Sequence, residues 1–137
     1  MKIITLLENT ARRPRLAAAR GLSVYAETAA HIILFDMGPD GTFLENARAL
    51  GVDLSAVDIA VQSHGHSDHG GGLAAFRAVN SKANIYLRLE ALGAYYAVLP
   101  GREPGYIGLP PEAEALRERF VFTGPEEALG DGLTLFS

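Results

Sequence analysis

The sequence predicts a layered α/β fold in a single domain. Short apolar runs of strand length alternate along the chain with segments whose apolar residues recur at helical spacing, which is typical of strands covered by helices. The chain has 137 residues, with a hydrophobic fraction of 48% and a charged fraction of 20%. These values are ordinary for one globular domain that is long enough to bury a core.

Strands are expected where apolar residues cluster between turn signals. The first run, residues 3–7, is continuously apolar except for one threonine, which predicts a strand covered on both faces. Residues 22–27 and 31–35 follow, and they are close enough to pair as a hairpin. Further strands are expected at residues 57–62, 84–87, 120–122 and 133–136.

Helices are expected between these strands. The first begins near Thr42, because Glu45 three residues later completes a capping-box pattern, and Gly51 suits its carboxyl end. Residues 100–111 are rich in glycine and proline and predict a loop of the kind that closes over active sites. Further helices are expected within residues 70–79, 89–99 and 112–119.

Composition limits the classes of function and location. A formal net charge of −4 gives no electrostatic reason to expect nucleic-acid binding. The absence of cysteine excludes disulfides and thiolate metal sites, so any metal ligands are nitrogen or oxygen donors. No segment is long enough for a membrane span, and the amino-terminal apolar run is too short for a signal peptide. We therefore expect a cytoplasmic protein without a membrane partner.

The segment from Ser63 to Gly70 carries the strongest chemical signal. It contains His64, His66, Asp68 and His69, which include three of the four histidines in the chain. Imidazole nitrogen and carboxylate oxygen are preferred ligands of Zn²⁺ and related ions. Residues two apart on an extended segment share a side, so His64 and His66 can converge on one metal, and Asp68 and His69 can face a second. The alternative is a polar surface turn that happens to be rich in histidine.

The pattern His-x-His-x-Asp-His at positions 64 to 69 resembles the signature of the metallo-β-lactamase superfamily. Residues 33–38 resemble the family's strand that ends in an aspartate before a glycine turn. Residues 43–54 and 106–110 are similar to a narrower subgroup, the dihydropterin-ribofuranosylaminobenzene-phosphate synthase-like proteins. The resemblance implies an αββα sandwich of two similar halves. Residues 1–137 have room for little more than the first half, so we expect a metallo-β-lactamase-like domain truncated at its carboxyl terminus.

The resemblance also implies a reaction. His64 and His66 would bind the first metal, and Asp68 and His69 the second; two zinc ions are expected, with manganese or iron as alternatives. Asp68 would also act in catalysis by orienting a metal-bound hydroxide that attacks an ester, phosphoester or related bond of a small molecule. The remaining family ligands belong to the second half, so weak metal binding is expected in this chain alone. The alternative is a non-catalytic metal-binding half-domain that pairs with itself or with a completing carboxyl-terminal half.

Five further residues have two interpretations each. Asp36 resembles the family's aspartate whose carboxylate holds the ligand loop by hydrogen bonds, and the alternative is an ordinary turn before Gly38. The subgroup resemblance implies that Asn9 contacts the substrate or supports a ligand, and the favoured alternative is a polar residue at a strand end. Arg12 and Arg13 belong to a local basic cluster that either binds a substrate phosphate or lies in a solvated loop. His31 precedes the motif, and a structural or surface role is favoured over metal binding.

Overall fold

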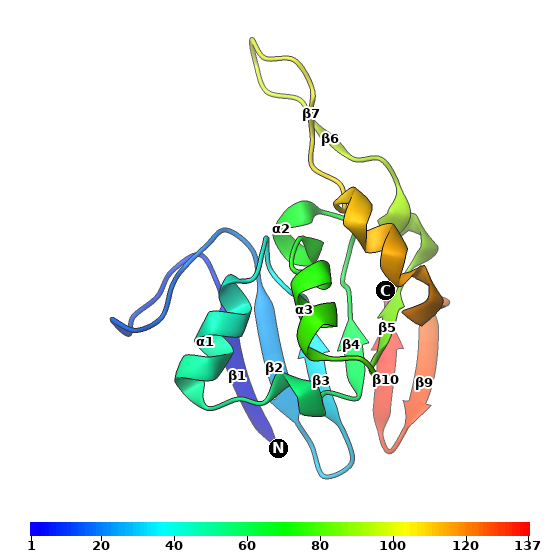
Figure 1. Ribbon diagram of the computed structural model, residues 1–137. Coiled ribbons are helices and arrows are strands. Elements are labelled where there is room, and N and C mark those ends of the chain that lie inside the picture. The colour runs from blue at the N-terminus through cyan, green and yellow to red at the C-terminus, as the bar shows by residue number, and fades with distance from the viewer.

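A six-stranded mixed sheet forms the centre of the protein (Figure 1). The computed structural model describes residues 1–137. The strand order is β1-β2-β3-β4-β5-β8, in which β1, β2 and β3 are antiparallel and β3, β4, β5 and β8 are parallel. The strands span Lys2–Leu7 (β1), Ser23–Glu27 (β2), Ile32–Phe35 (β3), Ile59–Val61 (β4), Asn84–Leu87 (β5) and Phe120–Phe122 (β8). The α/β expectation is confirmed, including the β2–β3 hairpin.

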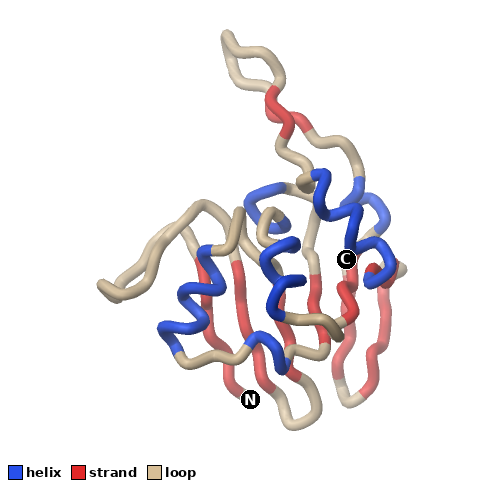
Figure 2. Tube along the Cα trace, in the orientation of Figure 1, coloured by secondary structure: helices blue, strands red, loops and turns tan.

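Helices cover one face of this sheet (Figures 1 and 2). They are α1 (Thr42–Leu50), α3 (Leu73–Val79) and the 3-10 helix η3 (Pro111–Arg119). Alternate strand residues point toward them, so Leu34 of β3 is fully buried together with Phe43 of α1 and Phe76 of α3. This face therefore holds the main hydrophobic core and fixes the sheet against the helices.

The other face is only partly covered. A separate hairpin, β9 (Glu126–Gly130) with β10 (Leu133–Phe136), packs against it. Ile33, Ile59 and Val61 from the sheet meet Leu133 and Leu135 of the hairpin in a second, smaller cluster. The sequence predicted β10 but missed β9, whose pattern of two glutamates, alanine, leucine and glycine lacks strand-forming residues.

The expectation that β1 is covered on both faces is wrong. Ile3 is 61% exposed, whereas Leu6 and Leu7 are buried in the main core. The hairpin lies over the middle of the sheet and does not reach this edge strand. A continuous apolar run cannot by itself distinguish a strand buried on both faces from one with an open face.

Helix α1 has the predicted extent but a different amino-terminal cap. Gly41 occupies the cap position, and no side chain caps the helix from there. The backbone N–H of Thr42 instead donates to Asp40 Oδ1 at 2.8 Å, so the Thr42–Glu45 capping box is wrong. Gly51 ends the helix in the left-handed conformation, as predicted.

The predicted helix at residues 89–99 is also wrong. Only the 3-10 helix η2 (Leu89–Leu92) forms, after which the chain enters an arm of two short strands, β6 (Tyr96–Ala97) and β7 (Gly105–Tyr106). The arm projects from the body of the protein (Figure 1). Its apolar residue Val98 is 74% exposed, so no core is available to stabilise a helix there. The helix expected at 112–119 is present as η3.

The remaining elements are the 3-10 helix η1 (Leu54–Ala56) and the one-turn helix α2 (Ser67–Gly70). None of the helices is long and apolar enough to cross a lipid bilayer.

Candidate metal centre

The histidine-rich segment lies at the carboxyl ends of the parallel strands. We call residues 63–70 the metal loop; it follows β4 and includes α2. Asp36 directly follows β3 at the same edge, and its N–H donates to Val61 O at 2.8 Å. Loops at this edge of an α/β sheet commonly carry functional residues, because parallel strands deliver them to one place.

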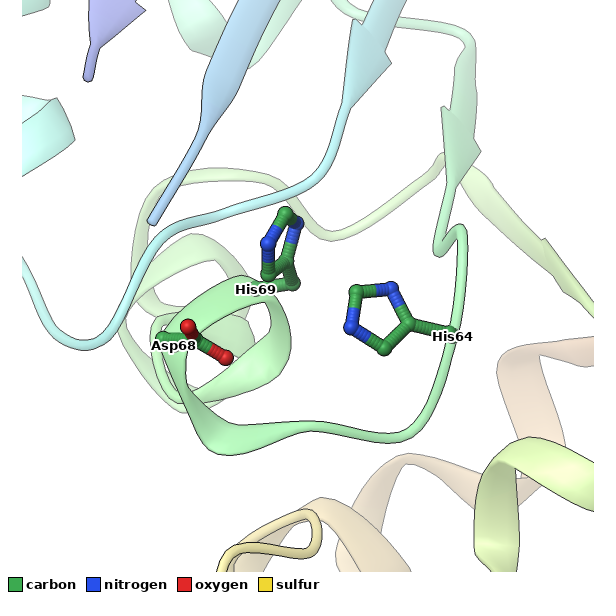
Figure 3. A group of neighbouring side chains, drawn as sticks. All are labelled: His64, Asp68 and His69. Atoms are coloured by element: carbon green, nitrogen blue, oxygen red, sulfur yellow. The ribbon is translucent and has the colours of Figure 1, made fainter. Parts of the chain in front are cut away.

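Three of the predicted ligands converge within this loop (Figure 3). One ligand atom each from His64, Asp68 and His69 lies within 4.8 Å of the others, and all three side chains are half-buried. His66 is adjacent but outside that group. Its ring lies 4.6 Å from the ring of His64 and 5.3 Å from that of Tyr95, measured between centroids. The extended segment therefore brings His64 and His66 side by side, while His64 shares the closer cluster with Asp68 and His69.

The buried carboxylate of Asp36 holds the cluster in place through hydrogen bonds. Asp36 is fully buried, and its Oδ2 lies 2.7 Å from His69 Nδ1. Its two oxygens also accept bonds from Ser63, from the N–H at 2.8 Å and from the hydroxyl at 2.7 Å. Asp36 has φ 55, a left-handed conformation that aspartate tolerates better than most residues. The geometry is that of an aspartate holding the ligand loop by hydrogen bonds.

These bonds determine the proton positions on both rings. The carboxylate accepts, so His69 Nδ1 donates, and in the neutral form of the ring Nε2 keeps its lone pair. Ser63 donates its only hydroxyl proton to Asp36, so it can only accept from His64 Nδ1, which lies 2.8 Å from Ser63 Oγ. His64 Nε2 is then also unprotonated. Asp36 thus prepares the Nε2 atoms of two histidines for metal binding.

The electrostatics of the loop favour a neutral His64 ring. Burial lowers the pKa of His64 below its ordinary value, and the neighbouring His69 and His66 lower it further. A neutral imidazole is the form that coordinates a metal. The donor set of imidazole nitrogens and a carboxylate oxygen fits a divalent transition metal such as zinc.

Close packing fixes the backbone of the metal loop. A Cβ on Gly65 would overlap the carbonyl oxygen of Ala91 in η2, so a side chain there would push the two segments apart. On the other side of the loop, Gln62 Nε2 donates to His64 O at 2.8 Å. The loop is therefore held between η2 and the sheet.

The other residues singled out in the sequence lie outside this cluster. Asn9 lies at the same edge, because β1 runs parallel to β3, and its Oδ1 accepts from Gly21 N at 3.0 Å. Arg12 and Arg13 line a separate hollow beside α1. His31 lies at the opposite end of the sheet, where its Nδ1 is 3.2 Å from Asp58 Oδ2. The substrate roles of Asn9, Arg12 and Arg13 stay predictions.

Sequence reasoning missed two residues of the site. Ser63 stands in the sequence only as the start of the motif, although a hydroxyl directly before a candidate ligand is a usable signal. Arg20 lies far from the motif in sequence, yet its Nε is 3.2 Å from Asp68 Oδ2. No local pattern marks Arg20, because the contact depends on the path of the loop between β1 and β2.

A sequence model of the metallo-β-lactamase superfamily matches residues 19–134. The chain belongs to the metallo-β-lactamase superfamily. The match includes Asp36, the whole metal loop and most of the sheet. The expected superfamily is therefore confirmed. The comparisons give no support for the narrower subgroup.

Solved structures of the superfamily share this fold. Tm1679, a metal-dependent hydrolase of the β-lactamase superfamily, is 29% identical, with a TM-score of 0.73 over 96% of this chain and 46% of its own. A B3 metallo-β-lactamase with an active-site glutamic acid is 21% identical, with a TM-score of 0.55 over 80% of this chain and 41% of its own. MEM-A1, a subclass B3 metallo-β-lactamase from a soil metagenome, is 19% identical, with a TM-score of 0.55 over 81% and 42%.

The last two identities are low, so they show the fold alone. The chain spans about half the length of these solved structures, with 46% of Tm1679 covered. No curated protein matches the chain.

Proposed function

We propose that the metal loop forms part of a zinc-dependent hydrolase site. The observation that carries the proposal is the convergence of His64, Asp68 and His69, with Asp36 leaving the Nε2 atoms of both histidines free. A bound divalent cation supplies a water whose pKa is lowered, and hence a hydroxide nucleophile near neutral pH. Asp68 is expected to orient that nucleophile, because its carboxylate can accept a hydrogen bond from it.

The number of metals is part of the proposal. The expected assignment gives His64 and His66 to one zinc ion and Asp68 and His69 to a second. The cluster of His64 with Asp68 and His69 supports at least one position, and manganese or iron would suit the same donors. A second ion depends on His66, whose ring faces Tyr95 as well as His64.

The substrate class follows from the resemblance. We propose a small molecule with an ester or phosphoester bond, and the similarity of residues 43–54 and 106–110 to the dihydropterin-linked subgroup favours a phosphate-bearing compound. Fold alone does not fix a substrate in such a family. A cytoplasmic location, expected from the sequence, belongs to the same proposal.

Metal uptake tests the proposal directly. The purified chain is titrated with Zn²⁺ in competition with a chromophoric chelator, and hydrolysis of bis(p-nitrophenyl) phosphate is then followed. We expect zinc binding that is lost in His64→Gln and retained in His31→Gln, a matched change at the opposite end of the sheet. Equal zinc affinity in the two variants would contradict the proposed ligand set. Zinc binding without hydrolysis would favour the second candidate below.

The second candidate is a metal-binding half-domain that pairs through its open sheet face. Ile3 of β1 is 61% exposed and Phe136 at the end of β10 is 86% exposed, so apolar side chains are exposed both on the sheet and on the hairpin. The occupant is a second copy or a completing carboxyl-terminal half. Sedimentation velocity checks this: we expect a concentration-dependent dimer that Ile3→Asp weakens. A wild-type chain that stays monomeric at all concentrations excludes self-pairing.

A further inference from the structure

Arg20 lies beside the metal loop although it comes from a different part of the fold. The loop between β1 and β2 extends away from the sheet (Figure 1), and Arg20 lies three residues before β2 begins at Ser23. There Arg20 Nε lies 3.2 Å from Asp68 Oδ2. Asp68 is a member of the candidate ligand cluster, so a positive charge stands directly at the edge of the metal centre.

The backbone at this point is fixed from two sides. Gly21 has φ 127, and a Cβ there would overlap the carbonyl oxygen of Asp68. The N–H of Gly21 also donates to Asn9 Oδ1 at 3.0 Å. Only glycine combines this backbone conformation with such a close approach. The start of the Arg20 side chain is therefore placed against the metal loop.

The guanidinium itself is largely free. Its side chain is 88% exposed, against 26% for that of Asp68. Only Nε has a protein partner, which leaves the two terminal nitrogens open to solvent. An exposed ion pair of this kind contributes little to stability, so stabilisation of the fold is a poor explanation for the placement. A planar fork of unpaired donors is instead suited to a carboxylate or a phosphate.

Metal binding would make the guanidinium of Arg20 more attractive to an anion. In the metal-free protein the carboxylate of Asp68 neutralises part of the Arg20 charge. When Asp68 serves as a metal ligand, its charge is shared with the cation, and the guanidinium can attract a further anion. The position of Arg20 at the edge of the cluster would then hold that anion next to the reacting bond.

We propose that Arg20 binds an anionic oxygen group, a carboxylate or a phosphate, of the substrate beside the metal. The inference rests on the proposed hydrolase function for its biological meaning, but anion binding by Arg20 can be measured independently. It assigns substrate recognition to a residue outside the Arg12–Arg13 cluster, because Arg20 is the arginine that contacts the metal loop.

The test is a titration with inorganic phosphate and, separately, with acetate. Binding is followed by isothermal calorimetry on the wild type, Arg20→Gln and Arg20→Lys, each with and without Zn²⁺. Arg48→Gln serves as the matched control, since Arg48 is an exposed arginine on α1. We expect Arg20→Gln to weaken anion binding roughly tenfold to hundredfold, the range for a lost charged hydrogen bond. Arg20→Lys should retain part of the affinity, and Arg48→Gln should equal the wild type.

The relative affinities for phosphate and acetate identify the anion. Equal anion binding in wild type and Arg20→Gln, with and without Zn²⁺, would overturn the inference. So would a loss of Zn²⁺ affinity in Arg20→Gln that accounts for the whole effect on phosphate, because Arg20 would then only position Asp68. If the wild type takes up no Zn²⁺, the proposed function fails, and the metal-free titration still decides whether Arg20 binds the anion.

Discussion

Asp36 determines, at the scale of single residues, which nitrogen of each neighbouring histidine carries a proton. Its oxygens accept from Ser63 and from His69 Nδ1, and Ser63 extends the effect to His64. The residue also has the left-handed backbone that lets the chain turn from β3. One position thus combines a turn with the support of two candidate ligands.

We predict that Asp36→Asn lowers zinc affinity roughly tenfold to hundredfold, as expected for the loss of a carboxylate behind a metal-bound histidine. Asparagine tolerates the same backbone conformation, so the turn should survive. Chelator competition measures the change. Asp58→Asn is the matched control, because Asp58 pairs with His31 Nδ1 at 3.2 Å far from the metal loop. A similar loss in both variants would contradict a specific role for Asp36.

Ser63→Ala should change the tautomer of His64 without changing that of His69. The hydroxyl accepts from His64 Nδ1 at 2.8 Å, while His69 bonds directly to Asp36. We expect ¹⁵N shifts of the rings to show a protonated Nδ1 at both residues in the metal-free wild type. In the variant, His64 should gain the other tautomer. A protonated His64 Nε2 already present in the wild type would contradict the hydrogen-bond order derived above.

The identity of the candidate ligands could be predicted from the sequence because they lie within six residues of each other. The contacts that orient them could not. Asp36 was a candidate only through resemblance, and Arg20 reaches Asp68 from another loop. Contacts between distant segments depend on tertiary packing, which no local spacing encodes.

At the scale of elements, helix α1 is stabilised by a side chain that lies just before its amino-terminal end. Asp40 precedes the helix, and its carboxylate accepts from the N–H of Thr42. Hydrogen bonds from the Thr42 side chain and backbone lower the pKa of Asp40 below its ordinary value of 3.8. A lowered pKa in the folded state means that the ionised carboxylate stabilises the fold.

We predict that Asp40→Ala lowers the stability at pH 7 by a few tenths to about 1 kcal/mol, the low end for a capping group because the site is largely exposed. The contribution is present above the unfolded pKa and is lost as pH falls through the lower folded pKa. The difference in melting temperature between wild type and variant should therefore shrink in strong acid. If the difference in melting temperature stays constant from neutral to acidic pH, the charge of the Asp40 carboxylate does not contribute to stability.

The positions of elements that pack against the main hydrophobic core could be predicted from the sequence, whereas the structure of the exposed arm could not. Strands β2 to β5 and helix α1 bury apolar residues in the main cluster. The segment after Leu92 has similar apolar residues, but Leu99 and Tyr106 are more than half exposed in the arm. The helix predicted at residues 89–99 therefore has no core to pack against, and tertiary contacts supply most of the stability of a helix.

At the scale of the whole molecule, metal binding should stabilise the fold. The candidate ligands come together only in the folded chain, so a cation binds the native state and not the unfolded one. We predict that Zn²⁺ at a hundredfold excess over its dissociation constant stabilises the protein by about 2.7 kcal/mol. Differential scanning calorimetry should show a higher melting temperature, which excess EDTA reverses. A shift of the same size in His64→Gln would place the zinc elsewhere.

The fold class and the positions of the six strands of the central sheet could be predicted from the alternation of apolar segments, but the order of these strands in the sheet could not. Strand β1 is an edge with Ile3 exposed, and β9–β10 covers the centre through Leu133 and Leu135. Which strands lie at an edge depends on pairing between distant segments. The sequence pattern of β1 would have been the same in a central strand.

The base of the arm is joined directly to the metal loop. Ser67 N donates to Ile107 O at 2.8 Å, and His66 forms a backbone bridge with Gly108. The arm extends outward from these contacts (Figure 1), so a small rotation of its base displaces its tip by a larger distance. A spin label or fluorophore attached at Arg102, near the tip, would report rearrangements of the loop from outside the site, without altering any of its side chains.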